Sequence, residues 1–326
     1  MEKKISVIGG GTGISSLLRG LKKYTKELSA IVTMSDDGGG SGILREDFQM
    51  LPPGDVRNCL VALSNTEPTM KNLLQYRFQS GSLKKQNVGN ILIAALYNIY
   101  GSFDQALLEM SNVFNITGNI YPVTLEDCHL VAELENKDKV IGESIIPKMS
   151  YKLNSKIVEI TMFPQVPKGN PRAMDAISQS DIIVLGPGSL YTSIIPNLLV
   201  EGICDRIAEA KGHVAYIANA MTQRGETPFY SVTDHINAIE YHSYSGIIDI
   251  CMVNNFKASP TIYKQYENYE DSLPIFLKRE EKNQLKQRGI QVVEGPFVEI
   301  KDGKIRHDGE RIGESLWSIF EHKERL

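Results

Sequence analysis

The feature that most constrains the fold is the order of an apolar run, a glycine cluster and a helical pattern at the start of the chain. Residues 5–8 are a short run of β-favouring side chains, and residues 14–21 have the spacing of a helix that buries one face. The loop between them consists of Gly9, Gly10, Gly11, Thr12 and Gly13. A second apolar run follows at residues 28–34. Strand, glycine loop, helix and strand open a doubly wound, mostly parallel sheet, so we predict an α/β, Rossmann-like fold.

The sequence pattern divides the chain into three regions. Residues 1–112 form the first, nucleotide-binding α/β half, with helices predicted at residues 58–80 and 87–111. Residues 113–160 carry short alternating runs separated by Asn, Lys and Gly, which predicts a β-rich hairpin insertion. Residues 161–326 resume the α/β pattern.

The second half repeats the strand signal several times. An uninterrupted apolar run at residues 181–185 predicts a strand buried on both faces. Apolar runs at residues 213–219 and 247–254 predict two more strands. Residues 256–285 are polar and predict a loosely organised connection, and residues 291–326 predict a strand, a hairpin and a C-terminal helix.

Composition excludes several classes of protein. The 326 residues carry 35 Lys and Arg against 39 Asp and Glu, a net charge of −4, so the total charge does not favour nucleic acid. No apolar run approaches the ~18 residues of a membrane span. The four cysteines are too scattered for a disulfide framework, and the six histidines lack the spacing of zinc ligands. The chain enters a strand at once, without a signal-peptide pattern, so we predict a cytoplasmic protein.

The first glycine loop is a candidate phosphate site. Glycines let the backbone approach a phosphate closely, and the helix that follows offers unpaired N–H groups and its positive dipole end. The fit to G-x-G-x-x-G is imperfect, because Ser16 stands at the third glycine position. The alternative is a tight turn without a ligand.

Two adjacent acids, Asp36 and Asp37, follow the second strand, 23 residues after Gly13 in the case of Asp36. In a dinucleotide fold, an acid about 20 residues downstream binds ribose hydroxyls. The pair could instead hold Mg²⁺ beside a phosphorylated ligand, and a solvated turn is the third interpretation. The loop after them adds backbone donors at Gly38, Gly39 and Ser41.

A third loop of this kind leaves the predicted strand at residues 181–185 and enters a helix. It contains Gly186, Pro187, Gly188 and Ser189, with Thr192 a turn later. The G-x-S-x-G motif is absent, so Ser189 is not favoured as a nucleophile. Because the carboxyl ends of parallel strands share one edge of a sheet, we predict that the three loops meet around one anionic ligand.

Other polar residues at predicted strand ends and helix starts complete the candidate ligand site: Asp55, Arg57, Asn58, Asn90, Asn219 and Thr222. Arg57 could clamp a phosphate or carboxylate with two parallel hydrogen bonds. Helix capping is an equally good explanation of Asp55 and Arg57, and each amide alone is more typical of a cap. No residue is assigned a catalytic role.

Five motifs together resemble the bacterial gluconeogenesis factor family, relatives of the 2-phospho-L-lactate transferases of deazaflavin-coenzyme biosynthesis. The resemblance runs from residue 1 to about residue 256. It is carried by residues 9–13, 35–39, 54–58, 185–194 and 219–227.

The resemblance implies a Rossmann-like fold, a cytoplasmic protein and a nucleotide-type ligand. The bacterial members are implicated in cell shape and envelope-precursor supply during growth on gluconeogenic carbon, and they are similar to proteins that bind UDP-sugars. The transferases move a phospholactyl group from a guanosine-activated donor to a deazaflavin alcohol, using Mg²⁺. Asp36 and Asp37 match their acidic pair, and residues 11–13 match their first glycine loop. Where the transferases have a further Asp-rich segment, this chain has residues 54–58.

Three functions remain open from the sequence. The first is a UDP-sugar-binding regulator of cell shape, which requires only the loops. The second is a Mg²⁺-dependent transferase of the phospholactate type, in which Asp36 and Asp37 hold the metal. The third is an NAD-binding protein. We predict a nucleotide or nucleotide-sugar partner, with Mg²⁺ as an optional companion, and a homo-oligomer is compatible with the sequence.

Overall fold

The computed structural model describes residues 2–323 and is built on a seven-stranded sheet with the order β10-β9-β8-β7-β1-β2-β3. Its strands are β1 (Ile5–Gly9), β2 (Leu28–Val32), β3 (Asn119–Pro122), β7 (Ile182–Leu185), β8 (His213–Ile217), β9 (Ile250–Asn254) and β10 (Gln291–Gly295). All neighbouring strands in this sheet run parallel. This confirms the predicted α/β, Rossmann-like fold.

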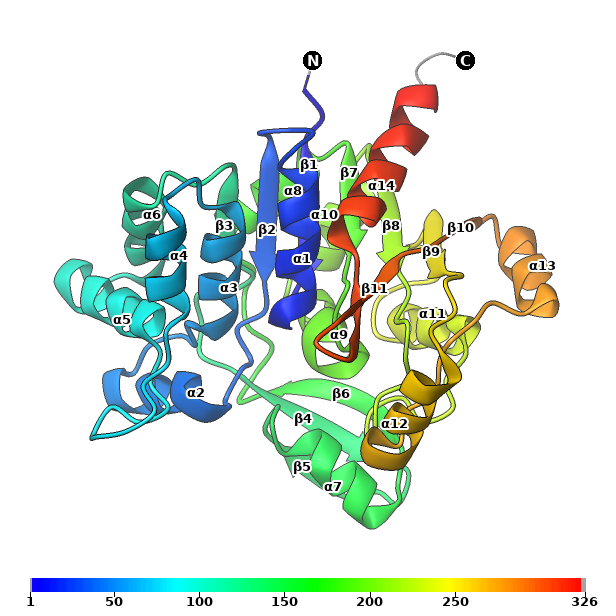
Figure 1. Cartoon of the computed structure of the whole chain (residues 1–326), viewed down its shortest axis with the longest axis horizontal. Coiled ribbons are helices and arrows are strands. Elements are labelled where there is room, and N and C mark those ends of the chain that lie inside the picture. The colour runs from blue at the N-terminus through cyan, green and yellow to red at the C-terminus, as the bar shows by residue number, and fades with distance from the viewer. Residues whose placement is uncertain (1, 324–326) are drawn as a thin grey trace.

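Helices cover both faces of the sheet (Figure 1). Side chains alternate between the faces, so Ile5 and Val7 of β1 belong to one apolar core and Ile8 belongs to the other. The first core is closed by α1 (Gly11–Leu21), α3 (Gly54–Leu63) and α14 (Gly309–Lys323). The second core is closed by α8 (Pro171–Ser178), α10 (Ile203–Glu209) and α11 (Val232–Tyr241). Burial on both faces explains why the strands read as uninterrupted apolar runs.

The prediction of two long helices at residues 58–80 and 87–111 is wrong, because the structure has a pair of shorter helices in place of each. The structure has α3, α4 (Pro68–Gln75), α5 (Val88–Tyr100) and α6 (Phe103–Val113) in this part of the chain. Pro68 occupies the first turn of α4, where a missing N–H costs nothing. Gly101 ends α5 in the left-handed conformation, and the Ser102 side chain then caps α6 by accepting from the Gln105 N–H.

The β-rich insertion is a three-stranded antiparallel sheet below the carboxyl edge of the main sheet (Figure 1). It consists of β4 (His129–Leu134), β5 (Lys139–Ile141) and β6 (Ile157–Phe163), with α7 (Ile146–Leu153) packed on it. The strand before it, β3, pairs with β2 and is the edge strand of the main sheet.

The prediction that residues 256–285 form a loosely organised connection is wrong. This segment contains α12 (Pro260–Glu270) and the start of α13 (Arg279–Gln287). Pro260 opens α12, and Tyr266 on that helix is buried. The predicted ending of the chain is confirmed: β10, a hairpin of β11 (Val298–Lys301) and β12 (Lys304–His307), then α14.

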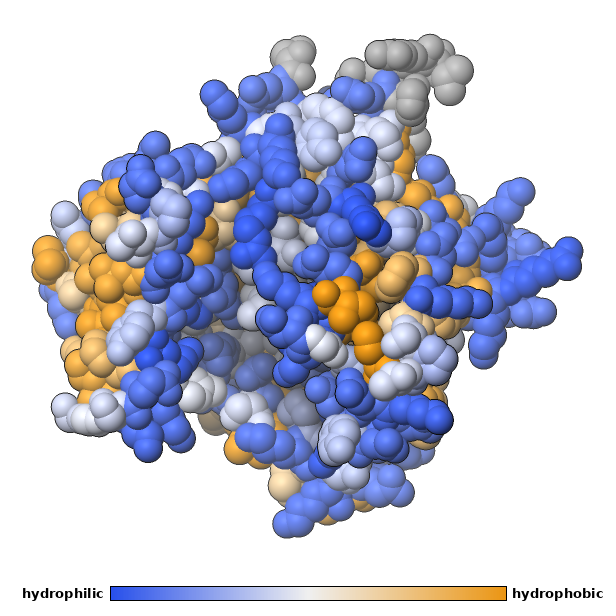
Figure 2. All heavy atoms as spheres, viewed as in Figure 1, coloured by the Kyte–Doolittle hydropathy of each residue, from blue (hydrophilic) through white to orange (hydrophobic). Residues whose placement is uncertain are grey.

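The surface of this face is polar over most of its area, with apolar side chains gathered over α5 and α6 at the left of Figure 2. Leu92, Ile99 and Leu108 are among the exposed large apolar side chains of those helices. Among residues 2–323, no helix combines the length and the apolar character that a membrane crossing requires.

Candidate functional site

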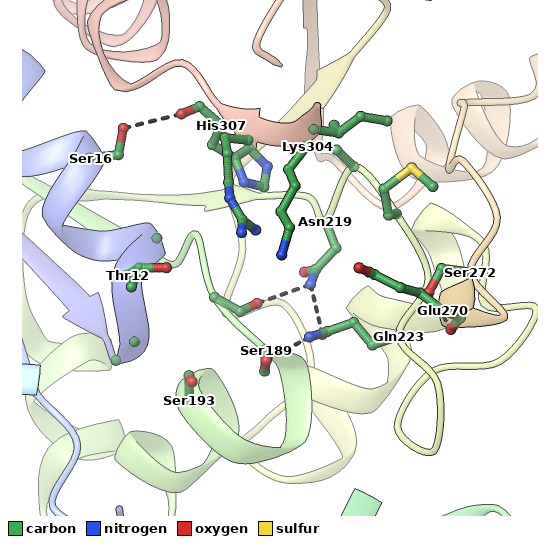
Figure 3. Close-up of a pocket in the computed structure, with 18 of the residues that line it drawn as sticks. Thr12, Ser16, Ser189, Ser193, Asn219, Gln223, Glu270, Ser272, Lys304 and His307 are labelled. Atoms are coloured by element: carbon green, nitrogen blue, oxygen red, sulfur yellow. Dashed lines mark hydrogen bonds between the residues drawn. The ribbon is translucent and has the colours of Figure 1, made fainter. Parts of the chain in front are cut away.

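A cavity of about 1010 Å³ lies at the carboxyl edge of the main sheet. Its walls come from the start of α1, the π-helical turn η1 (Leu190–Ile194), the loop at residues 219–224, α12 and the β11–β12 hairpin. Figure 3 shows side chains from these separate segments pointing into one space. This is the edge at which open α/β sheets bind ligands.

The first and third loops contact each other directly. Gly13, at the start of α1, packs on the backbone carbonyl of Pro187 so closely that a Cβ atom at residue 13 has no room. Gly9 also lies beside Gly186, but a Cβ atom there would be at an ordinary van der Waals distance of 3.7 Å from Gly186 Cα. The two loops meet because β1 and β7 are neighbouring parallel strands.

A carboxylate from the chain itself occupies the start of α1. The Gly11 N–H donates to Asp55 Oδ2 at 2.6 Å, so this backbone donor is already used. Burial raises the pKa of Asp55 to about 6, although the Gly11 bond and the nearby Arg57 charge act in the opposite direction. The N-terminus of α1 is therefore an anion site whose anion is Asp55.

A second internal carboxylate, Glu226, caps η1. It accepts from the Tyr191 N–H at 3.3 Å and from the Thr192 hydroxyl at 3.3 Å. Burial raises the pKa of Glu226 to about 7, against these hydrogen bonds. Glu226 was not among the predicted site residues, although it lies in the motif at residues 219–227.

An amide network orients the third loop. Asn219 Nδ2 donates to the Gly188 carbonyl at 3.0 Å, and Gln223 Nε2 donates to Ser189 Oγ at 2.7 Å (Figure 3). Asn219 Nδ2 also reaches Gln223 Oε1 at 3.3 Å. Thr222 is fixed by backbone and hydroxyl bonds to Leu273. These contacts hold Ser189 at the cavity wall as a neutral polar group.

Basic side chains line the opposite wall. Lys301, Lys304 and Arg306 come from the β11–β12 hairpin, and Arg19 comes from α1. Figure 3 shows Lys304 pointing across the cavity toward Asn219. Within the described part of the chain, no ion pair involves Lys304 or Arg306. The same hairpin also contributes Glu299 and Asp302 to the lining, so this wall carries both signs of charge, with the basic side chains in excess.

His307 closes the inner end of the hairpin. Its Nε2 lies 3.2 Å from the Ala218 carbonyl, and burial lowers its pKa. The neutral ring with the proton on Nε2 satisfies this contact. Ser16 of α1 donates to the His307 carbonyl at 3.1 Å, which ties the hairpin to α1 (Figure 3).

An acidic group lies beside the cavity and reaches its wall through Glu143. Burial first, and then the charges of Asp36, Asp37, Glu226 and Asp55, raise the pKa of Glu143 to about 8. Asp36 Oδ1 accepts from the Gly38 N–H and Asp37 Oδ1 from the Ser144 N–H, each at 2.9 Å. The two adjacent carboxylates thus bond to different loops.

Metal coordination by protein side chains alone is not evident here. Across residues 2–323, no three or more His, Cys, Asp or Glu side chains have the geometry to hold a metal ion. Mg²⁺ commonly takes one or two carboxylates and completes its shell with water and substrate phosphates. Its binding by Asp36 and Asp37 stays a prediction.

The structure separates the predicted site residues into two sets. Those that line the cavity are Gly10, Gly11, Thr12, Gly13, Asn58, Gly188, Ser189, Thr192, Asn219 and Thr222. The others lie behind or beside it: Gly9, Asp36, Asp37, Gly38, Gly39, Ser41, Asp55, Arg57, Asn90, Gly186 and Pro187. Lining residues that were not among the predicted site residues include Ser16, Arg19, Glu143, Gln223, Arg224, Glu226, Glu270, Glu299, Lys301, Asp302, Lys304, Arg306 and His307.

The fold and the cavity define a class: a doubly wound α/β protein with a polar cavity at the carboxyl edge of its sheet. A profile of the family described as 2-phospho-L-lactate transferase CofD matches residues 5–298. The chain therefore belongs to the CofD family, in the group of its members named gluconeogenesis factor.

Individual relatives match over nearly the whole chain. A protein of Thermoanaerobacterium thermosulfurigenes is 48% identical over 318 residues, covering 98% of this chain and 97% of the relative. The gluconeogenesis factor of Bacillus subtilis (strain 168) is 41% identical over 320 residues, covering 98% of each chain. A crystal structure of a Bacillus halodurans protein superposes with a TM-score of 0.92 at 40% identity, covering 97% of this chain and 100% of that one.

Proposed function

We propose that the protein binds a nucleotide-sugar, specifically a UDP-sugar, in the cavity and acts through this bound state as a cytoplasmic regulator of cell shape during gluconeogenic growth. The observation that carries the binding proposal is the pairing of a basic wall with an amide-lined wall across one cavity. The regulatory role, the uridine base and the compartment rest on the resemblance to gluconeogenesis factors.

The two walls suit the two parts of such a ligand. A diphosphate carries charge that Lys304 and Arg306 can neutralise, since both lie on the cavity wall. Sugar and base present donors and acceptors in fixed directions, which the Asn219–Gln223 amide network can match. The volume of about 1010 Å³ is at the upper end of the roughly 300–1,000 Å³ typical of small-molecule sites.

Dinucleotide binding is less well supported. In that class an acid after the second strand binds the ribose hydroxyls. Here Asp36 bonds to the Gly38 N–H, and Asp55 occupies the start of α1 where a pyrophosphate would lie.

Calorimetric titration tests the proposal. UDP-N-acetylglucosamine is expected to bind, and Lys304→Gln is expected to weaken binding about tenfold or more, because a charged hydrogen bond contributes ~1.5–3 kcal/mol. Lys139→Gln, an exposed lysine on β5 outside the cavity, is the matched control and should bind as the unchanged protein does. No heat from any UDP-sugar, or equal binding by both variants, contradicts the proposal.

A second candidate function is a Mg²⁺-dependent transferase of the 2-phospho-L-lactate type. The observation that favours it is the acidic group of Asp36, Asp37, Asp55 and Glu143 beside the cavity, whose mutual repulsion a cation would relieve. When bound, Mg²⁺ would neutralise charge on the transferred phosphoryl group. Asp36→Ala should then abolish transfer of a phospholactyl group, and unchanged turnover would exclude this role for Asp36.

A further inference from the structure

A second cluster of polar side chains lies outside the cavity, where the first turns of α2 (Gly39–Phe48) and α5 meet α3. Arg57 of α3 is only 9% exposed, and its guanidinium donates to Asn58 Oδ1 at 2.7 Å. Arg57 Nε is buried and has no hydrogen-bond partner among residues 2–323. A buried guanidinium N–H without a partner is costly, so its presence points to a group that completes it.

Arg57 lies across the start of α5. A Cβ atom on Gly89, in the first turn of α5, would be 2.8 Å from Arg57 Cδ, so the side chain packs flat on this turn. Asn87 caps α5 through Oδ1, which accepts from the Asn90 N–H at 3.2 Å. Asn87 is 0% and Asn90 2% exposed, yet Asn87 Nδ2 and Asn90 Oδ1 have no partner within the described residues.

A second arginine, Arg77, reaches the same place from the segment before α5. Gly40 lies in the first turn of α2. The position that a Cβ atom would take on Gly40 is 3.6 Å from Arg77 Nη1 and 3.1 Å from Gln86 Oε1. Gln86 Oε1 is buried and also lacks a partner in the part of the chain that the structure describes. Beside Gly39 there is open space: apart from its neighbours along the chain, no atom lies within 4 Å of the position that a Cβ atom would take on Gly39.

Several positive charges converge at this point. Two guanidinium groups and the positive dipole ends of two helices converge. The charge of Arg77, after burial, lowers the pKa of Arg57. Asp55 and Asp36 offset part of this charge, but Asp55 bonds to the Gly11 N–H, and Asp36 bonds to the Gly38 N–H and Ser41. No ion pair joins either arginine to a carboxylate in residues 2–323.

We propose that Arg57, Arg77, Asn87 and the first turns of α2 and α5 form a second anion site, which holds the phosphate group of a phosphorylated small molecule. Planar guanidinium donors and helix N-termini are the groups that proteins use for phosphate. The amides of Asn90 and Gln86 can turn their NH₂ groups toward the anion, because the two orientations of an amide differ little in shape.

This site is adjacent to the nucleotide cavity but distinct from it. Asn58, the partner of Arg57, lines the cavity, whereas Arg57, Arg77 and Asn87 do not. The protein would thus bind two ligands side by side, a nucleotide-sugar and a phosphorylated compound. Nothing in the second site requires the nucleotide-sugar proposal to hold.

Binding of inorganic phosphate, followed by calorimetry and by ³¹P line broadening, tests the second site. The unchanged protein should bind phosphate saturably, and Arg77→Gln should weaken binding about tenfold or more. Gly40→Ala places a methyl group against Gln86 and Arg77 and should weaken it as well. Arg206→Gln, an exposed arginine that pairs with Glu209 elsewhere, is the matched control and should bind phosphate normally.

Lys304→Gln separates the two sites. Phosphate binding should survive Lys304→Gln, and UDP-sugar binding should survive Arg77→Gln. Absence of saturable phosphate binding overturns the second site, and so does phosphate binding that Lys304→Gln removes, because the phosphate then occupies the nucleotide cavity. Equal phosphate binding by Arg77→Gln and Arg206→Gln also overturns it. Arg77 is exposed, so its variant is a safer test than one at buried Arg57.

Discussion

Two regions of the molecule gather helix N-termini, and they treat the positive end of the helix in opposite ways. At the carboxyl edge of the sheet, Asp55 bonds to the start of α1 and Glu226 to the start of η1. Between α2 and α5, the corresponding helix ends face Arg57 and Arg77, which have no ion pair in the described chain. The first region supplies its own anions. The second has Asp36 at the start of α2 but also places two arginines beside positive dipole ends, an arrangement that an external anion would stabilise.

The difference shows that a glycine loop at a helix start is not by itself a phosphate site. The Gly11 N–H in the most motif-like loop is already paired with a carboxylate, whereas most of the cations that line the cavity come from a distant hairpin. Charge balance around a helix end is a better guide to its ligand than the glycine pattern that precedes it.

The largest expected effect comes from removing an internal anion. Asp55→Ala should lower the free energy of unfolding by about 2 kcal/mol, because it removes a helix cap and leaves the Gly11 N–H without its acceptor. Urea denaturation at about pH 5 measures it, because above its raised pKa of about 6 the buried, ionised Asp55 itself costs stability. Asp47→Ala, an exposed acid on α2, is the control and should change stability by less than about 0.5 kcal/mol. If both variants are equally stable, Asp55 does not act as the anion of α1.

Much of this first region could be predicted from the sequence, because its geometry follows from strand order. Once residues 5–9 and 182–185 are strands of one parallel sheet, their following loops must emerge at the same edge, and the structure brings Gly13 against Pro187. The paired helices at residues 54–75 and 88–113 also had local signals that the periodicity obscured. Pro68 and the Gly101–Ser102 sequence mark the breaks.

The remaining site residues depend on contacts that no local pattern encodes. Lys304 and Arg306 reach the cavity because the C-terminal hairpin folds back over α1, nearly three hundred residues earlier in the chain. Glu226 caps a turn 34 or 35 residues before it. Arg57 and Asn90 were indicated as ligand residues, but Arg77 reaches them through an isolated antiparallel bridge to Asn87, and Gln86 directly precedes Asn87.

The pH dependence of stability offers a second, smaller test of the acidic side. The pKa of Glu143 is raised from its ordinary value of 4.5 to about 8, so the folded protein keeps this proton in a range where the unfolded chain has lost it. The resulting contribution to stability is present below about pH 4.5 and is lost as the pH rises through about 8.

Glu143→Gln removes this titration. The unfolding free energy of the unchanged protein, relative to this variant, should therefore fall as the pH rises from about 5 to about 8. Urea denaturation across this range measures the unfolding free energy of both proteins. Buried histidines such as His235 and His307 contribute with the opposite pH dependence, but equally in both proteins, so their contribution cancels in the difference. Parallel profiles for the two proteins would show that Glu143 is not held among the carboxylates of the acidic side.

The smallest expected effect is on the arginine side, and its sign is informative. In phosphate-free buffer, Arg77→Gln should change the unfolding free energy by less than about 0.5 kcal/mol and in the stabilising direction. The relieved repulsion with Arg57 outweighs the loss of the exposed hydrogen bond from Arg77 Nη1 to the Lys85 carbonyl, which water replaces. Added salt should reduce this gain by screening the two charges. Arg206→Gln loses an exposed ion pair with Glu209 and should be neutral or slightly destabilising. If Arg77→Gln lowered the free energy of unfolding as much as Asp55→Ala does, Arg77 would be neutralising an internal anion. Both regions would then be balanced from within, and neither would need an external phosphate.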